Sequence, residues 1–244
     1  MSGAVRRPHP IDAPGTHERD WAAWLGGKAF AALEVAGIDS AVIVAAHPDD
    51  EVLGAGGLIS VLAAAGARVR LIAVTDGEAS HRGHADPAEL ARRRTAETAT
   101  ALRALGAARA EVVRLGLPDG GLAAGEDDLA VALGRLTAGF GVCLAPWDRD
   151  MHPDHEAAGR AARRVSPRVL CYPVWMWHWA FPGDPRVPWD RAAVVPLPPF
   201  AVMRKRAAIG CFASQLEDRG GGLGPVLPPG MTAHFTRAVE VLFQ

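Results

Sequence analysis

Residues 41–57, AVIVAAHPDDEVLGAGG, are the stretch on which the predicted fold depends. The six small apolar residues from Ala41 to Ala46 predict a strand that is buried on both faces, as in a parallel sheet. The segment His47-Pro48-Asp49-Asp50-Glu51 follows, where the strand ends and a helix begins. Open α/β sheets bind their ligands at that edge, outside the carboxyl ends of the strands. An imidazole and three carboxyl groups are therefore expected at a ligand-binding edge.

The alternation of strand and helix patterns continues along the chain. Strands are expected at 41–46, 68–74, 111–115, 140–145 and 168–172, and helices at 51–65, 87–106, 127–138 and about 154–164. This spacing predicts the α/β class, with a mostly parallel sheet and helices on both faces. The sequence contains neither an internal repeat nor a long linker, so residues 1–244 are interpreted as one domain.

The two ends of the chain are less regular. Residues 1–18 predict a flexible arm, and a helix is expected over 19–37. Residues 173–244 are interpreted as a substrate and packing region, with a helix at 199–213 and a strand at 235–243. The alternation in 175–179, WMWHW, predicts a strand with three tryptophans on one face, which form either a core or dimer contact or a substrate wall. The last five residues, EVLFQ, also resemble the remnant of a protease-cleavage tag.

The composition argues against several classes of protein. Hydrophobic residues make up 49% of the 244 residues and charged residues 22%, which suits a large core rather than a disordered chain. A net charge of −1 without runs of like charge argues against nucleic-acid binding. The three cysteines provide neither a disulfide framework nor a CxxC metal clip. No apolar stretch reaches the roughly 18 residues of a membrane span, and the N-terminus has no signal-peptide core, so a cytoplasmic protein is expected.

A second polar cluster, His152-Pro153-Asp154-His155, follows the expected strand 140–145. Both clusters can face one crevice, because each lies beyond the carboxyl end of a strand. Imidazole and carboxylate are ligands for Zn²⁺, and two histidines with one carboxylate also suit Fe²⁺. A neighbouring free carboxylate would serve as a general base. The alternative for Asp49, Asp50 and Glu51 is helix capping and dipole compensation alone.

Several segments together resemble the PIG-L/LmbE-like deacetylase family. They are AHPDDEVLGAGG, TDGE, the helix with ALRALGA, LPDGGL, HPDHEAAG and KRAAIGCFASQ, in order from about residue 41 to 243. The resemblance implies a Rossmann-like sheet and a zinc-dependent hydrolase, with Fe²⁺ as the other candidate metal. Members of that family mostly remove an acetyl group from N-acetylglucosamine-type sugars. A small-molecule N-acetylated amino sugar, in small-molecule or natural-product biosynthesis, is the implied substrate.

The resemblance also implies roles for individual residues. His47, Asp50 and His155 would be the metal ligands, and Asp49 the general base for the attacking water. His152 would stabilise the oxyanion and protonate the leaving amine, and Asp154 would orient the imidazole of His152. A tyrosine that assists the oxyanion in some members is not found, since Asp150 and Met151 stand there. The candidate substrate-binding residues are Arg94, Glu51, Asp76, Glu78 and Trp177.

Three alternatives stay open at this point. The enzyme could be an amidase of mycothiol-like conjugates or a hydrolase of another N-acyl group. It could instead be a non-catalytic Rossmann module that binds a nucleotide or sugar through Gly54–Gly57. It could also be a family member that keeps its metal site and has lost activity. A homo-oligomer is compatible with each of them.

Overall fold

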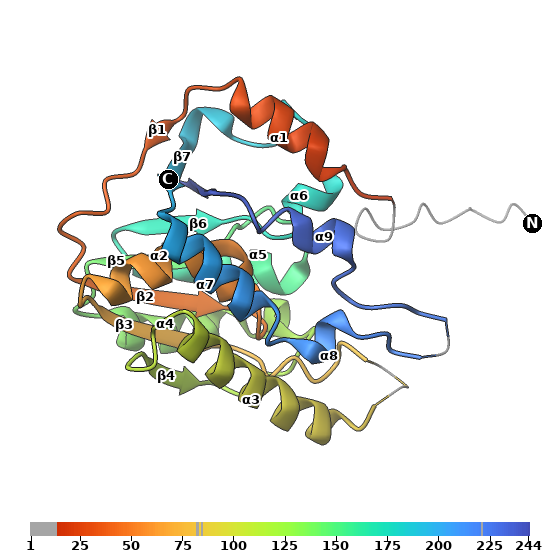
Figure 1. The fold of residues 1–244 in the computed structure, drawn as a ribbon. Helices are drawn as coiled ribbons and strands as arrows, with labels where there is room; N and C mark the ends of the chain where they lie inside the picture. Colours follow the sequence, from red (N-terminus) through yellow and green to blue (C-terminus); the bar gives the residue numbers. More distant parts are fainter. Residues whose placement is uncertain (1–13, 82, 84, 221) are drawn as a thin grey trace, which may run out of the picture.

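The computed structural model describes residues 14–81, 83, 85–220 and 222–244, and its strands form one sheet (Figure 1). Eight strands among these residues are hydrogen-bonded in the order β1-β7-β8-β6-β5-β2-β3-β4. Among them β8 alone is antiparallel to its neighbours. The strand bounds are β1 Ala31–Ala32, β2 Ser40–Ala45, β3 Arg68–Ala73, β4 Glu111–Arg114, β5 Val142–Pro146, β6 Val169–Tyr172, β7 Ala192–Pro196 and β8 Val239–Phe243.

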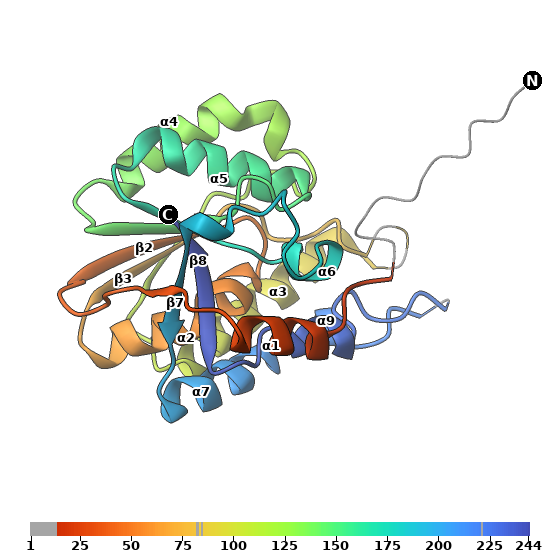
Figure 2. The same cartoon turned by 90° about the horizontal axis from the view of Figure 1, so that it is seen from above.

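Helices cover both faces of the sheet, as Figure 2 shows. α2 (Asp50–Ala64), α3 (Pro87–Ala104) and α7 (Pro199–Ile209) lie on one face, and α4 (Glu126–Thr137) and α5 (Pro153–Val165) lie on the other. The short helices are α1 (Glu18–Gly26), α6 (Met176–Trp179), α8 (Ala213–Leu216) and α9 (Pro229–Ala233). The predicted α/β class, with a mostly parallel sheet between two helical layers, is confirmed. None of the helices in the described part of the chain is long and apolar enough to cross a membrane.

The order of the strands creates a crevice between β2 and β5. The two strands are parallel neighbours, with Ala41 opposite Val142 and Ile43 opposite Leu144. The chain leaves β2 into α2 on one face and leaves β5 into α5 on the other face (Figure 2). The loops therefore separate at this point, which is the topological switch point where open α/β sheets bind ligands. The two polar clusters of the sequence follow these two strands.

The glycines at 54–57 lie inside α2 and serve close packing. A Cβ atom on Gly54 would stand 2.0 Å from the Tyr172 ring, and one on Gly57 would stand 2.3 Å from the Leu197 side chain. Tyr172 and Leu197 are themselves buried. The space that a bound phosphate would need is thus filled by side chains. The alternative that these glycines bind a nucleotide is wrong.

Three predicted elements in the irregular regions differ from the structure. The helix expected over 19–37 ends at Gly26, because Gly26 and Gly27 favour a helix end, and β1 follows. Residues 176–179 form the short helix α6, with Trp175 as its N-cap residue, and not a strand, so the three tryptophans do not share a face. The helix expected over 199–213 is divided at 210–212 into α7 and α8.

The predicted flexible arm lies mostly outside the described residues, since only 14–18 are described. Thr16 in this part is tied to the chain near α6. Its amide donates to His178 O at 2.9 Å, and its hydroxyl donates to Ala180 O at 2.5 Å. The end of the expected arm is therefore bonded to the segment that contains α6. The helix α1 begins at Glu18.

The final strand lies inside the sheet, so the residues that resemble a cleavage tag are part of the fold. β8 lies between β6 and β7. The buried Glu240 carboxylate accepts a hydrogen bond from the Lys205 ammonium at 2.6 Å. It also accepts hydrogen bonds from the backbone amides of Gly57 and Leu58 at 2.7 and 2.8 Å. The strand thus fixes α2 and α7 through one ion pair, which compensates the burial of both charges.

Replacement of Glu240 by Ala is expected to destabilise the fold by about 3–5 kcal/mol, because it leaves the Lys205 charge buried and unpaired. Denaturant unfolding measures the change. Glu111→Ala is the matched control, since it removes the Arg70 partner at an exposed site and should cost about 0–1 kcal/mol. A Glu240→Ala effect no larger than that of Glu111→Ala would contradict this account.

A second prediction concerns the acid dependence of stability. Burial would raise the pKa of Glu18, but hydrogen bonds from His234 at 2.6 Å and Arg237 at 2.7 Å hold that pKa below its usual value. A carboxyl pKa that is lowered by folding gives stability above the unfolded pKa, and this stability is lost as pH falls through the folded pKa. Glu18→Gln should therefore lower the free energy of unfolding near pH 7 and flatten its decline below about pH 4.5. Unchanged slopes in pH-dependent denaturant unfolding would contradict the prediction.

Candidate metal centre and catalytic pocket

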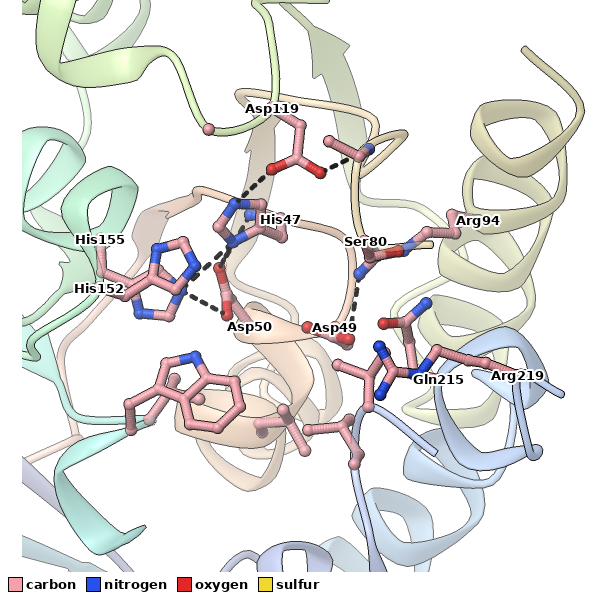
Figure 3. A pocket seen from close by; sticks show the side chains of 17 residues that line it. His47, Asp49, Asp50, Ser80, Arg94, Asp119, His152, His155, Gln215 and Arg219 are labelled. Carbon is pink, nitrogen blue, oxygen red and sulfur yellow. Dashed lines mark hydrogen bonds and ion pairs between the residues drawn. The ribbon is translucent and has the colours of Figure 1, made fainter. Parts of the chain in front are cut away.

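The three predicted ligand side chains meet at the crevice between β2 and β5, where the two histidines contact different oxygens of Asp50 (Figure 3). His47 Nδ1 lies 3.3 Å from His155 Nε2 and 3.5 Å from Asp50 Oδ2, and His155 Nε2 lies 3.2 Å from Asp50 Oδ1. Ligand atoms in a tetrahedron at about 2.0–2.1 Å from zinc lie about 3.3–3.4 Å from one another. The separations therefore fit one shared cation, and the donor set of two imidazoles and one carboxylate suits Zn²⁺ or Fe²⁺.

The position of Asp50 follows from a strained turn at the start of α2. Asp49 has a φ of 112°, a conformation that L residues with side chains rarely adopt. The turn places the Asp50 carboxylate where it accepts a hydrogen bond from the backbone amide of His47 at 2.8 Å. Burial would raise the pKa of Asp50, but His155 and His47 hold it well below its usual value. Asp50 is therefore a carboxylate, the form that binds a metal.

His155 is held from behind by Asp150. His155 Nδ1 lies 2.8 Å from Asp150 Oδ2, which leaves Nε2 directed at the ligand cluster. Burial would lower the pKa of His155, but Asp50 and Asp150 raise it to about 9. Asp150 also accepts the amides of Trp175 at 2.9 Å and Met176 at 2.8 Å. In the sequence, Asp150 was noted only because it stands where some family members have a tyrosine. Its position in the loop after a buried strand could have indicated that it supports the site.

His47 is held by two carboxylates on its other nitrogen. His47 Nε2 lies 3.1 Å from Asp154 Oδ2 and 3.2 Å from Asp119 Oδ1. Asp154 also accepts the amides of Gly120 at 2.7 Å and Leu122 at 3.1 Å. Among the described residues, the hydrogen bonds of Asp154 thus go to His47 and this loop and none goes to His152, so its expected role in orienting His152 stays a prediction. Asp119, in the LPDGG segment, was not identified from sequence.

His152 is the N-cap residue of α5 and faces the same cluster. Its ring centroid lies 4.8 Å from that of His47 and 4.6 Å from that of His155. Burial and the neighbouring His155 and His47 lower its pKa to about 3. Its Nδ1 atom is buried without a hydrogen-bond partner among the described residues. The imidazole is thus a neutral polar group that faces the ligand atoms.

Asp49 lies beside the ligand cluster and is bonded to Arg94. Arg94 Nη2 donates to Asp49 Oδ2 at 3.2 Å and to Pro48 O at 2.6 Å, and Nη1 donates to Gly77 O at 2.9 Å. A Cβ atom on Gly77 would stand 2.0 Å from the guanidinium, so this position requires glycine. Burial raises the pKa of Asp49 to about 7, against the lowering effect of Arg94. Such a carboxyl can exchange a proton near neutral pH.

The sequence matches a known protein family over just over half of its length. Residues 42–166 match the family described as PIG-L: GlcNAc-PI de-N-acetylase. The chain belongs to this family. The match includes most of β2, all of β5 and the segments after these strands, which contain His47, Asp50 and His155.

Comparison with individual proteins gives the same family context. The chain is 37% identical over 140 residues to the 1D-myo-inositol 2-acetamido-2-deoxy-alpha-D-glucopyranoside deacetylase of Kineococcus radiotolerans. That match covers 53% of this chain and 37% of the relative, so it spans well under half of the relative's length.

Solved structures of other proteins share the fold. A conserved protein from Thermus thermophilus is 32% identical, with a TM-score of 0.53 over 73% of this chain and 80% of that one. The N,N'-diacetylchitobiose deacetylase from Pyrococcus horikoshii has a TM-score of 0.56 at 20% identity, over 76% and 75% of the two chains. At that identity the second likeness shows the fold alone.

The pocket of this family member has a volume of about 280 Å³, and its lining differs from the predicted substrate contacts. Arg94 lines it, as expected, although its guanidinium is bonded to the protein. Glu51 does not, because it is fully buried and its carboxyl accepts the Asp49 amide at 3.2 Å. Burial raises the pKa of Glu51 to about 8. The prediction of substrate contact for Glu51 is wrong.

Three further predicted contacts lie outside the pocket. Asp76 is bonded through both oxygens to Arg114, at 2.9 and 2.6 Å. Glu78 accepts the Asp119 amide at 2.9 Å and so supports the pocket from behind. Trp177 is buried against Trp21, with ring centroids 5.0 Å apart. Four polar residues that were not selected from the sequence line the pocket in their place, namely Ser80, Asp119, Gln215 and Arg219. Trp175, one of the tryptophans expected as a possible substrate wall, lines it as well.

Replacement of Asp150 by Asn is expected to weaken metal binding by about 10–100-fold, because the amide cannot replace the carboxylate behind His155. Competition for Zn²⁺ with a coloured chelator measures the affinity, and near-ultraviolet circular dichroism verifies the fold. Asp127→Asn, at an exposed site on α4 paired with Arg164, is the control and should bind zinc as the parent does. Equal affinities for the two variants would contradict the assignment of Asp150.

Proposed function

We propose that the chain is a metal-dependent hydrolase that removes the acetyl group from an N-acetylated amino sugar of the GlcNAc type. The observation that carries the proposal is the set of ligand atoms 3.2–3.5 Å apart beside the Asp49 carboxyl in a pocket. Membership of the PIG-L family and the named activity of the Kineococcus relative support it.

His47, Asp50 and His155 are proposed to hold the metal, with Zn²⁺ as the first candidate and Fe²⁺ as the second. A cation there would polarise the amide carbonyl and lower the pKa of water. Two other sets of side chains lie close enough to share a cation, and both include His47. One adds His152 and His155, and the other adds Asp119 and Asp154. We favour His47, Asp50 and His155 because Asp119 and Asp154 already bond to the far nitrogen of His47.

The chain's own residues divide the proton transfers between two sides of the cluster. Figure 3 shows Asp49 and His152 on opposite sides of the His47–Asp50 contact. Asp49 accepts the proton of the attacking water, and Arg94 fixes the direction of its carboxyl group. His152 donates an N–H hydrogen bond to the oxyanion as it forms. The leaving amine takes a proton from His152 as the imidazole regains one from the protonated Asp49, so that the proton removed from the water ends on the amine. A neutral amide requires both steps, because its carbonyl is a poor electrophile and its amine a poor leaving group.

The pocket lining supports an amino sugar as the substrate. Ser80 and Gln215 provide hydroxyl and amide groups across from the ligand cluster, and Asp119 adds a carboxylate beside His47 (Figure 3). Such groups suit sugar hydroxyls. Amidase action on mycothiol-like conjugates, or on another N-acyl group, would use the same machinery. A place in small-molecule or natural-product biosynthesis and a cytoplasmic location stay predictions of the sequence.

Acetate release from a panel of N-acetylglucosaminides, with and without chelator, tests the proposal. Chelation should abolish the release and added Zn²⁺ should restore it. Asp49→Asn should keep the bound metal and lower kcat by about 10²–10⁴-fold, whereas Asp127→Asn should retain activity. Activity that is indifferent to chelator would overturn the metal mechanism. If the zinc-loaded protein hydrolyses no substrate and Asp49→Asn changes nothing measurable, the result would support the alternative that the chain is a family member that has lost activity.

A further inference from the structure

A buried carboxylate on α3, that of Glu97, lies behind the catalytic pocket and binds the segment that supplies Gln215. Its oxygens accept hydrogen bonds from the backbone amide of Ser214 at 2.8 Å and from the Ser214 hydroxyl at 2.6 Å. Arg93 Nε donates to the same carboxylate at 3.2 Å. Burial of a charged group costs free energy unless the group is hydrogen-bonded, so these three bonds are what stabilises the Glu97 carboxylate inside the protein.

The Ser214 hydroxyl connects Glu97 to the side chain of Gln215. A carboxylate accepts hydrogen bonds and donates none, so the hydroxyl proton of Ser214 is directed at Glu97. The Ser214 oxygen is therefore left as an acceptor, and Gln215 Nε2 donates to it at 3.0 Å. The three side chains thus form a hydrogen-bond chain in which each donor points toward Glu97.

This chain sets the orientation of the Gln215 amide, which lines the catalytic pocket. Because Nε2 is bonded to Ser214, Oε1 is directed away from Ser214. Figure 3 shows the Gln215 oxygen on the side that faces Asp49 and the nitrogen on the other side. The backbone of Gln215 is held as well, since its amide donates to Phe212 O and its carbonyl accepts the Leu227 amide, both at 2.9 Å. Gln215 therefore presents an acceptor, and not a donor, to a ligand in the pocket.

The neighbouring Ser80 hydroxyl also has its proton bonded within the protein. Ser80 Oγ donates to Gly77 O at 3.1 Å, so its remaining capacity toward the pocket is that of an acceptor. A ligand group that fits between Ser80 and Gln215 must therefore donate. The donors of an N-acetylated amino sugar are its amide N–H and its hydroxyls, and the amide belongs at the ligand cluster. The group that remains for Gln215 is a sugar hydroxyl.

We propose that Glu97 is a positioning residue for this reaction, which acts through Ser214 to hold Gln215 as the acceptor for a hydroxyl of the sugar. The inference rests on the proposed function, because an N-acetylated amino sugar supplies the hydroxyl. The negative charge of Glu97 is essential to this role. In Glu97→Gln the new amide can donate to Ser214, whose hydroxyl then donates to Gln215 Oε1. That reversal turns Gln215 Nε2 toward the pocket.

The test compares kcat/KM for methyl N-acetylglucosaminide with that for three analogues, which carry fluorine in place of the hydroxyl at the third, fourth or sixth carbon. Fluorine cannot donate a hydrogen bond. The parent should therefore hydrolyse at least one analogue about 10–100-fold less well, because a buried acceptor loses its partner. Glu97→Gln should reduce this preference about 10-fold at one ring position and leave the other positions unchanged. The effect of fluorine on the amide chemistry is the same in both proteins, so the comparison isolates the contact.

Two further variants separate positioning from a merely structural role. Glu217→Gln is the matched control, because the exposed Glu217 binds the same Arg93 at 2.7 Å and has no hydrogen bond to Ser214 among the described residues. It should keep the preference of the parent. Gln215→Glu, made in the Glu97→Gln protein, should restore the preference, since a carboxylate presents acceptor oxygens in either orientation. An equal loss of activity on all four compounds, without this rescue, would overturn the inference.

The remaining outcomes also decide the inference. A hydroxyl preference that is absent from the parent, or that Glu97→Gln leaves unchanged at every ring position, overturns it, while hydrolysis of methyl N-acetylglucosaminide still supports the proposed function. If no compound is hydrolysed, calorimetric binding of the same four compounds to the zinc-loaded parent and variants gives the same comparison without turnover. A hydroxyl preference in binding that Glu97→Gln weakens then supports the role of Glu97, and equal ratios in parent and variant overturn it.

Discussion

The parallel pairing of β2 with β5 is the constraint on which the site depends. Hydrogen bonds that place Ile43 opposite Leu144 bring the carboxyl ends of two strands, about 100 residues apart in sequence, to the same edge. The chain then leaves the two strands on opposite faces, and the crevice opens between them. His47 and Asp50 come from one strand end and His155 from the other. Without this pairing neither segment holds enough ligands for a catalytic metal, which takes three from the protein.

The carboxylates behind the histidines connect ligand geometry to the loops that shape the pocket. Asp150 bonds His155 and the amides of 174–176, and Asp154 bonds His47 and the amides of Gly120 and Leu122. Asp119 bonds both His47 and the Ala79 amide. Each ligand imidazole is therefore oriented by a group that also fixes a substrate-side loop. Loop movement and ligand geometry are coupled for that reason, and a loop substitution can change metal affinity without contact to the metal.

The sequence predicted what depends on local pattern. The strand Ala41–Ala46, the helix start near Glu51 and the two His/Asp clusters are visible because buried strands and strand-end polar residues have local signatures. The partner of Asp154 was not predictable, since it depends on how the loop at 116–122 folds over His47. The WMWHW segment was misread because a four-residue helix is too short to show a period, and the amides held by Asp150 decide its form. Glu51 and Trp177 were misassigned because polarity and aromaticity do not reveal burial.

The balance of charge in the crevice favours a bound cation. Four carboxylates lie in the cluster or directly behind it, those of Asp50, Asp119, Asp150 and Asp154, and burial raises the pKa values of the neighbouring Asp49 and Glu51 to about 7 and about 8. Arg94 and Arg219 are the arginines among the pocket-lining residues. Burial alone would lower the pKa values of His47 and His155, yet the surrounding carboxylates raise both. The field between the two rings therefore attracts positive charge, and a divalent ion would replace the protons that the imidazoles otherwise take up. The Arg94 guanidinium bonds to Asp49 and to two backbone carbonyls. It therefore does not occupy the position between the two imidazole rings, where the cation would bind.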